Sequence, residues 1–108
     1  MSNVANIYKL PYYAVVFSSE RTGIDNYYSL MAAKMVELAS KQKGYLGVES
    51  ARDSNLGITV SYWETIEDIV AWKANAAHQV AQERGKKEWY SRFAVRICKV
   101  ERDYQFEI

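Results

Sequence analysis

Residues that build crosslinks and metal sites are almost missing from this sequence, which has one cysteine and one histidine in 108 residues. Cys98 has no partner within the chain, so no disulfide is expected, and one cysteine with one histidine does not make a zinc site. No apolar run approaches the roughly 20 residues of a membrane helix, and residues 1–11 lack the apolar core of a signal peptide. These absences predict a reduced, cytoplasmic protein that binds no metal and does not enter a membrane.

An excess of one charge is also lacking, because 14 lysines and arginines stand against 13 aspartates and glutamates. The formal net charge of +1, without a long run of either sign, disfavours nucleic acid as a partner. With 49% hydrophobic and 25% charged residues the composition is that of a globular protein. The length predicts one domain over residues 1–108, with 1–10 as a loose lead-in.

Aromatic residues, by contrast, are abundant, since they make up 14% of the chain and include nine tyrosines. Some of these rings are expected in the core. A small domain can also use them to line a cavity, because they offer apolar walls with a few hydroxyl groups. The composition is therefore consistent with an aromatic core and with a cavity lined by aromatic rings.

Hydrophobic periodicity predicts a helix and four strands. The helix is expected at about 24–42, on an apolar stripe whose methionines would fill gaps in the core. The stripe consists of Ile24, Tyr28, Met31, Met35 and Leu38. β-Branched and aromatic content predicts the strands. They are Tyr12–Phe17, Tyr45–Arg52, Ile58–Trp63 and Ser91–Phe106.

A second helical region is predicted to start at Thr65. On one unbroken helix Trp72 and His78 would diverge by about 120°, because they are six residues apart at about 100° per residue. Asn75 is able to cap a new helix, so a break is expected there, which would turn both side chains toward one pocket. The helical segments expected beyond the break are 76–84 and 86–90.

The predicted order is β-α-β-β-α-β, with the second helix in two pieces, which is the ferredoxin-like α+β arrangement with an antiparallel sheet. The turn chemistry of Asp53 to Gly57 makes the middle strands a hairpin, and alternation places Thr59, Ser61 and Trp63 on one face. Helices cover only one face of such a sheet, so the other face needs a second layer. A final strand longer than the usual ~5–6 residues would reach a second copy, which predicts a symmetric homodimer.

Five short stretches in the second half of the chain form a pattern of their own. They are Tyr62-Trp63-Glu64, Ile69-Val70-Ala71-Trp72-Lys73, Ala77-His78, Trp89-Tyr90 and Val100-Glu101-Arg102-Asp103-Tyr104. With them the sequence resembles the antibiotic biosynthesis monooxygenase (ABM) family over about residues 11 to 106. The resemblance implies a dimeric α/β barrel in which each subunit has a pocket between sheet and helices. Some members of that family oxidise polycyclic phenols with O₂ without metal or flavin, and others degrade haem.

The predicted function is a cofactor-independent monooxygenase acting on a small aromatic or phenolic substrate, with His78 as the catalytic base. Carboxylates ordinarily titrate near ~4 and lysines near ~10, whereas a histidine, at about 6.5, accepts a phenol proton close to neutral pH. The predicted substrate-binding residues are Trp63 and Trp72 as walls, Tyr62 and Tyr90 as hydrogen-bond donors, and Arg92 for an anionic group. Each of them also has a purely structural interpretation, as a core ring, a packed side chain or an inter-subunit ion pair.

Two alternative functions stay open at this point. One is a non-catalytic dimer that binds a small ligand or serves a stress role. The other is haem binding or degradation, for which members of the family use an asparagine on the first strand, a tryptophan on the second helix and an iron-ligating histidine. Trp72 matches the tryptophan, but the first strand has no asparagine and Gln82 stands where the histidine is expected.

Overall fold

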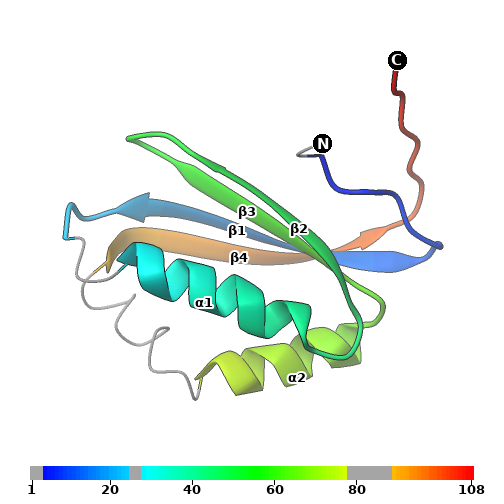
Figure 1. Ribbon diagram of the computed structural model, residues 1–108, viewed down its shortest axis with the longest axis horizontal. Coiled ribbons are helices and arrows are strands. Elements are labelled where there is room, and N and C mark those ends of the chain that lie inside the picture. Colours follow the sequence, from blue (N-terminus) through cyan, green and yellow to red (C-terminus); the bar gives the residue numbers. More distant parts are fainter. Residues whose placement is uncertain (1–3, 25–27, 78–88) are drawn as a thin grey trace.

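The computed structural model describes residues 4–24, 28–77 and 89–108 and arranges them as four strands and two helices (Figure 1). The strands are β1 (Tyr12–Arg21), β2 (Tyr45–Arg52), β3 (Gly57–Trp63) and β4 (Tyr90–Val100), and the helices are α1 (Tyr28–Ser40) and α2 (Ile66–Ala77). The predicted β-α-β-β-α-β order is confirmed.

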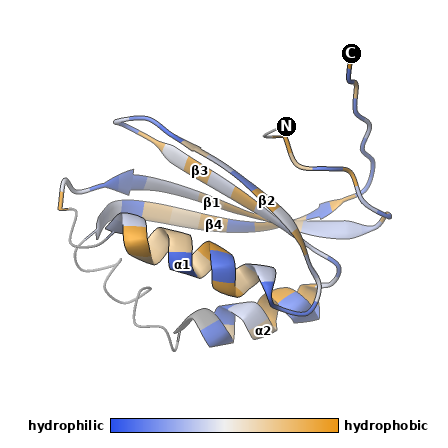
Figure 2. Ribbon diagram, viewed as in Figure 1, coloured by the Kyte–Doolittle hydropathy of each residue, from blue (hydrophilic) through white to orange (hydrophobic). Residues whose placement is uncertain are grey.

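The four strands form one antiparallel sheet in the order β2-β3-β1-β4. Both helices lie on one face of this sheet, and the first and last segments of the chain lie on its other side (Figure 1). Apolar and polar residues alternate along both helices, as expected for helices that turn one face to a sheet (Figure 2). The fold is therefore the predicted ferredoxin-like α+β fold.

The core lies between β3 and the two helices. Trp63 is completely buried and packs with Ala39 of α1 and Ile69 of α2. Four partly buried residues surround this cluster: Tyr13, Val15, Tyr45 and Trp72. The predicted alternation along the third strand is confirmed, because Trp63 faces the helices.

The start of α2 is fixed by local hydrogen bonds. The hydroxyl of Thr65 accepts the backbone N–H of Asp68 at 3.0 Å, which caps the helix where the sequence predicts it. Gly44, in the turn before β2, has a left-handed φ of 83°, and a Cβ there would overlap the Asp68 side chain. Its carbonyl accepts the N–H of Glu64 at 2.8 Å, so this turn and the beginning of α2 are held together.

The predicted helix break at Asn75 is wrong, because α2 continues through this residue to Ala77. Asn75 is flanked by Ala74 and Ala76, and alanine is the strongest helix former, so local propensity outweighs the capping preference of one asparagine. The segments predicted at 76–84 and 86–90 lie outside the described residues except for their first two and last two positions.

The first strand is longer than predicted, since β1 extends to Arg21 instead of ending at Phe17. β4 offers a backbone partner to each residue from Ser18 to Arg21, and this pairing outweighs the turn preference of the serines. At the other end of the connection Ile24 is not helical, so α1 is shorter than the predicted 24–42 at both ends.

The final strand is shorter than predicted, since β4 ends at Val100 and not at Phe106. Val100 pairs with Tyr12, the first residue of β1, and Pro11 before it has no N–H to donate. No strand therefore exists for residues beyond Val100 to pair with in the described part of the chain.

The segment before β1 is anchored to the far side of the sheet. The carboxylate of Glu49 accepts the backbone N–H of Ala5 at 2.8 Å and the hydroxyl of Tyr62 at 2.5 Å. These two hydrogen bonds hold the pKa of the Glu49 carboxyl below its usual value. Residues 4–11 form no helix or strand, yet they are tied to β2 and β3 by side-chain contacts.

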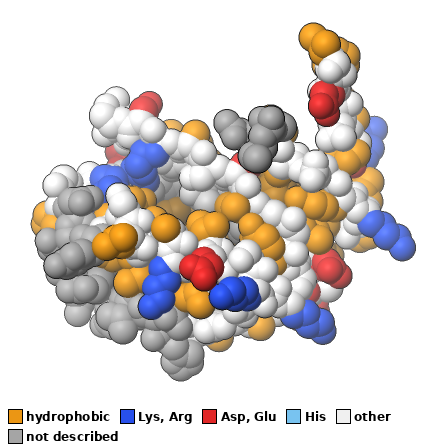
Figure 3. All heavy atoms as spheres, viewed as in Figure 1, with side chains coloured by type: hydrophobic (Ala, Val, Ile, Leu, Met, Phe, Trp, Pro, Cys, Tyr) orange, Lys and Arg blue, Asp and Glu red, His pale blue; other side chains and the backbone are white. Residues whose placement is uncertain are grey.

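The segment after β4 leaves the sheet with its apolar side chains exposed. The hydroxyl of Tyr12 donates to Asp103 at 2.6 Å, and burial together with this hydrogen bond raises the pKa of Tyr12 to about 12. Further along, Tyr104 and Phe106 are 93% and 85% exposed, and Ile108 is fully exposed. Apolar side chains are visible on this projecting segment in Figure 3.

Candidate functional site

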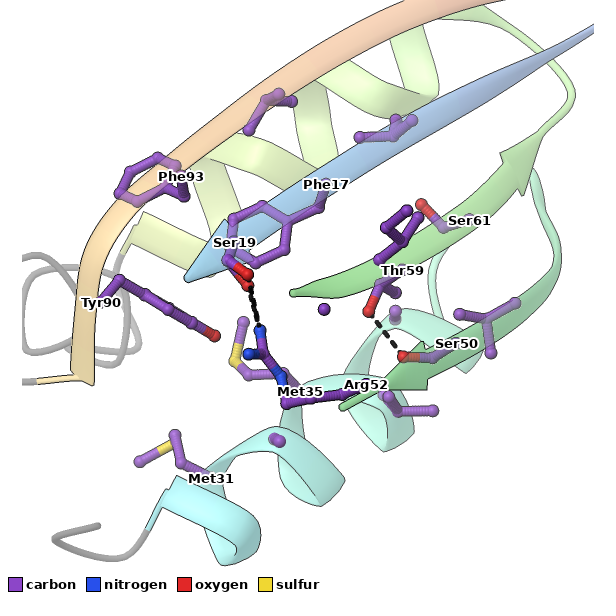
Figure 4. A pocket seen from close by; sticks show the side chains of 18 of the residues that line it. Phe17, Ser19, Met31, Met35, Ser50, Arg52, Thr59, Ser61, Tyr90 and Phe93 are labelled. Carbon is purple, nitrogen blue, oxygen red and sulfur yellow. Dashed lines mark hydrogen bonds between the residues drawn. The ribbon is translucent and has the colours of Figure 1, made fainter. Parts of the chain in front are cut away.

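A cavity of about 540 Å³ lies between the sheet and α1, a size typical of small-ligand sites (Figure 4). The described residues that line it come from all four strands and from both helices. Val36, Ile58 and Val95 line it and are still 45, 41 and 51% exposed, so the cavity opens to solvent. Its lining is mostly apolar, with a few hydroxyl groups and one cluster of polar side chains at one end.

The floor of the cavity is shaped by β3. Three small residues of this strand face the cavity, namely Gly57, Thr59 and Ser61. The next residue on the same face of the strand is Trp63. The cavity lies over the small residues and stops at the indole, whose N–H donates to the Ser61 hydroxyl at 2.9 Å. One strand therefore sets both the depth and the end of the cavity.

An aromatic wall stands beside this floor. The ring of Phe17 lies 5.4 Å from that of Tyr90 and 5.5 Å from that of Phe93, measured between centroids. Met31 and Met35 of α1 lie on the helix side of the cavity (Figure 4). These methionines, predicted to fill gaps in the core, line the cavity instead, where their flexible thioethers can adapt to a ring.

Tyrosine and arginine side chains gather where β1 and α1 meet the beginning of β4. The hydroxyl of Tyr90 donates to that of Tyr28 at 3.2 Å, and the guanidinium of Arg21 lies 3.5 Å from the centre of the Tyr28 ring. Burial, and after it the hydrogen bond with Tyr28, raises the pKa of Tyr90. At neutral pH Tyr90 is therefore a protonated hydroxyl that can donate a hydrogen bond and cannot serve as a base.

Two of the five predicted substrate-binding residues, Trp72 and Tyr90, line the cavity. Trp63 lies behind Trp72, with ring centroids 6.1 Å apart and planes inclined by 23°. Trp63 is completely buried and does not line the cavity, so it supports Trp72 from the core side.

The other predicted site residues are elsewhere. Tyr62 lies on the opposite face of the sheet, where its hydroxyl is bound to Glu49. Arg92 also lies away from the cavity, in a smaller pocket that includes Glu20 and Arg96. His78, the predicted base, lies outside the described residues.

Arg52 and Ser19 line the cavity and were missed by the sequence analysis. A signal for Arg52 existed in the hairpin turn, where one carboxylate oxygen of Asp53 accepts the N–H groups of Asn55 and Leu56 at 2.7 and 2.8 Å. This turn sets the register that places Arg52 opposite Gly57 on the face of Thr59 and Ser61. Counting back from the predicted turn would have put Arg52 on the cavity side.

Proton acceptors are scarce in this site. Among the described residues that line the cavity there is no carboxylate, no amine and no imidazole. Arginine side chains do not act as bases in proteins, and Tyr90 stays protonated at neutral pH. The described lining can therefore donate hydrogen bonds to a ligand but cannot remove its proton.

Within the described residues no group of three or more His, Cys, Asp or Glu side chains is placed to hold a metal ion. None of the helices in that part of the chain is long and apolar enough to cross a bilayer. Cys98 is an exposed free thiol. The absence of a cofactor and the cytoplasmic location stay predictions from the sequence.

The fold and the cavity together define a class, that of ferredoxin-like α+β proteins with a ligand-sized cavity between sheet and helices. The model of the antibiotic biosynthesis monooxygenase family matches residues 11–84, which run from just before β1 to beyond α2. The chain belongs to this family, and the resemblance found in the sequence is confirmed.

One sequence relative and two solved structures are similar to this chain. The uncharacterized protein YqjZ of Bacillus subtilis (strain 168) is 47% identical over 98 residues, which cover 90% of this chain and 86% of YqjZ. A mutant of SnoaB, a cofactor-independent oxygenase from Streptomyces nogalater, is similar with a TM-score of 0.73 and 9% identity over 85% of this chain and 95% of its own. Protein SO0527 from Shewanella oneidensis has a TM-score of 0.71 and 15% identity over 83% and 91% of the two chains. At such low identities the two solved structures show a shared fold.

Proposed function

We propose that this protein is a cofactor-independent monooxygenase that oxidises a small phenolic ring with O₂. The observation that carries the proposal is the cavity of about 540 Å³, in which aromatic side chains form flat walls and hydroxyl groups provide donors. Such a cavity accepts a planar ring and offers hydrogen bonds to its oxygen atoms. Membership of the family and the fold shared with SnoaB support the same function.

Anthrone, whose enol form is a phenol, serves as an example of the chemistry. Loss of the enol proton leaves an electron-rich anion that transfers electrons to O₂. One oxygen atom becomes the new carbonyl of anthraquinone, and the other leaves as water with the two hydrogens of the oxidised carbon. Phe17 and Trp72 would pack on the ring, and the Tyr90 hydroxyl would turn from Tyr28 to donate a hydrogen bond to the anionic oxygen. His78 remains the proposed proton acceptor, because none of the described residues that line the cavity has a side chain that can take up this proton.

Oxygen consumption by the purified, chelator-treated protein tests the proposal. With anthrone, one O₂ should disappear for each anthraquinone formed, faster than in buffer or with heat-denatured protein. The matched control is 9-methoxyanthracene, which has the same ring system and no ionisable proton, and which should bind without oxygen uptake. Oxygen uptake no faster than in buffer would contradict the proposal. A tight complex without turnover would then favour the ligand-binding dimer, and a Soret band on titration with haem would favour the haem function.

The proposal includes a homodimer. Its support is the exposed apolar surface at one edge of the sheet, where Val95 and Ile97 of β4 are 51% and 50% exposed. Beyond β4, the projecting side chains of Tyr104, Phe106 and Ile108 leave most or all of their surface exposed. A second copy would cover these surfaces.

Sedimentation velocity tests the dimer. The intact chain should sediment as a dimer, and removal of residues 104–108 should shift it toward the monomer while leaving the Tyr12–Asp103 hydrogen bond in place. A Lys9→Gln variant, altered outside this edge, should remain dimeric. A stable, folded monomer of the intact chain at micromolar concentration would refute the proposed assembly.

A further inference from the structure

Arg52, Gly57 and Ser19 form a row across three neighbouring strands. Gly57 of β3 pairs with Arg52 of β2 on one side and with Ser19 of β1 on the other. Because Gly57 has no side chain, the Arg52 side chain lies across β3 and its Nη2 donates to the Ser19 carbonyl at 3.4 Å and to the Ser19 hydroxyl (Figure 4). A Cβ on Gly57 would overlap the guanidinium, so this position of Arg52 depends on glycine.

In the described part of the chain, the charge of Arg52 is only partly balanced, by the exposed carboxylate of the neighbouring Asp53. No carboxylate among the described residues forms an ion pair with it, and it is the one charged side chain among the described residues that line the cavity. The guanidinium is anchored by Ser19, which is 2% exposed, while Arg52 itself is exposed at the cavity opening. Only Nη2 hydrogen-bonds to described residues, so Nε and Nη1 keep donors for a ligand.

We propose that Arg52, held in place by Ser19 and Gly57, binds a carboxylate group of the ligand whose aromatic ring occupies the cavity. A carboxylate suits the remaining donors because it carries the opposite charge and accepts charge-assisted hydrogen bonds, which a neutral phenol oxygen does not offer. Next to it the cavity is apolar and aromatic, with Phe17 and Tyr90 among its walls, so the ring and the charge of one ligand would be recognised side by side. The inference rests on the proposed function for the ring and adds an aromatic acid as the substrate class.

Calorimetric titration with two probes of nearly equal shape tests the carboxylate site. At neutral pH 2-naphthoate is ionised, whereas 2-naphthamide carries no charge and the same ring. The native protein should bind the naphthoate about 10- to 100-fold more tightly, the range expected for hydrogen bonds to a charged group. Equal affinity for both probes, or binding of neither, would overturn the proposal.

Three variants assign the preference to Arg52. Arg52→Gln should bind the two probes equally while keeping its affinity for naphthamide. Gly57→Ala retains the arginine but displaces its guanidinium, so the preference should fall in a variant whose charge is unchanged. Arg102→Gln removes the same charge from an exposed arginine outside the cavity lining and should behave like the native protein. A naphthoate preference that survives in both Arg52→Gln and Gly57→Ala would overturn the proposal.

These binding measurements do not depend on turnover. A preference for naphthoate that is lost in Arg52→Gln would support the carboxylate site even if no phenol were oxidised. Oxidation of anthrone with no preference for naphthoate would support the monooxygenase and remove the carboxylate from the description of its substrate. The two proposals can therefore fail separately.

Discussion

Replacing Trp63 by alanine should lower the free energy of unfolding by about 3–5 kcal/mol, the usual cost of removing a buried tryptophan. Trp63 is completely buried among Ala39 and Ile69, and its ring meets those of Tyr45 and Trp72 at centroid distances of 5.6 and 6.1 Å. A small domain is stable by only about 5–15 kcal/mol, so this one change removes a large share of the total.

Two other substitutions separate the contributions to this loss. Trp63→Phe keeps a ring in the core and gives up the indole hydrogen bond to Ser61, so it should cost clearly less than alanine. Trp72→Ala should also cost less, because Trp72 is only partly buried, and it should weaken ligand binding more than Trp63→Phe. Urea unfolding followed by far-ultraviolet circular dichroism measures all three without relying on tryptophan fluorescence. A loss below about 1 kcal/mol for Trp63→Ala would show that the core does not depend on this ring.

Replacing His78 by alanine should reduce oxygenation of anthrone by about 10²–10⁴-fold, the usual contribution of a general base. The expectation follows from elimination. The lining described by the structure has hydroxyl groups and one guanidinium but no group that takes up a proton near pH 7. His78 is the only histidine of the chain and comes directly after α2 in the sequence, and α2 places Trp72 in the cavity wall.

The pH dependence of the oxygenation rate tests whether His78 acts as a base. A base works only when deprotonated, so the native rate should rise with pH through the range in which an imidazole ordinarily titrates, near ~6.5. In His78→Ala that rise should disappear, and thermal unfolding should show whether the variant is folded. Gln82→Ala, altered in the same segment without removing an ionisable group, is the matched control. An unchanged rate and pH profile in His78→Ala would remove this residue from the mechanism and leave ionisation of the substrate in solution as the route.

The sequence was most informative where one residue pattern determines one structural outcome. Alternation along the third strand assigned Thr59, Ser61 and Trp63 to one face, and the structure has them there because the period of a strand leaves no other choice. The hydroxyl of Thr65 likewise marks the beginning of α2. Such features are local, so they can be predicted without knowing which strands are neighbours in the sheet.

The sequence was less informative where the outcome depends on a distant partner. The ends of β1 and β4 follow from their pairing with each other, which no single segment reveals. The same holds for the site, because Arg52 and Ser19 are 33 residues apart and meet only across Gly57. Tyr62 was predicted to bind the substrate because it belongs to a stretch that resembles the family. It lies instead on the face opposite the cavity, where its hydroxyl binds Glu49.

The three small residues that β3 turns to the cavity have a consequence for how such proteins diverge. β3 is paired on both sides through its backbone, and this pairing places no demand on the size of the side chains at Gly57, Thr59 and Ser61. A larger residue at any of the three, or a smaller one at Thr59 or Ser61, changes the room for a ligand while the hydrogen bonds of the sheet stay as they are. Descent within the family can therefore preserve the architecture over long times while the accepted molecule changes in a few substitutions, so kinship predicts the shape of a member far better than its substrate.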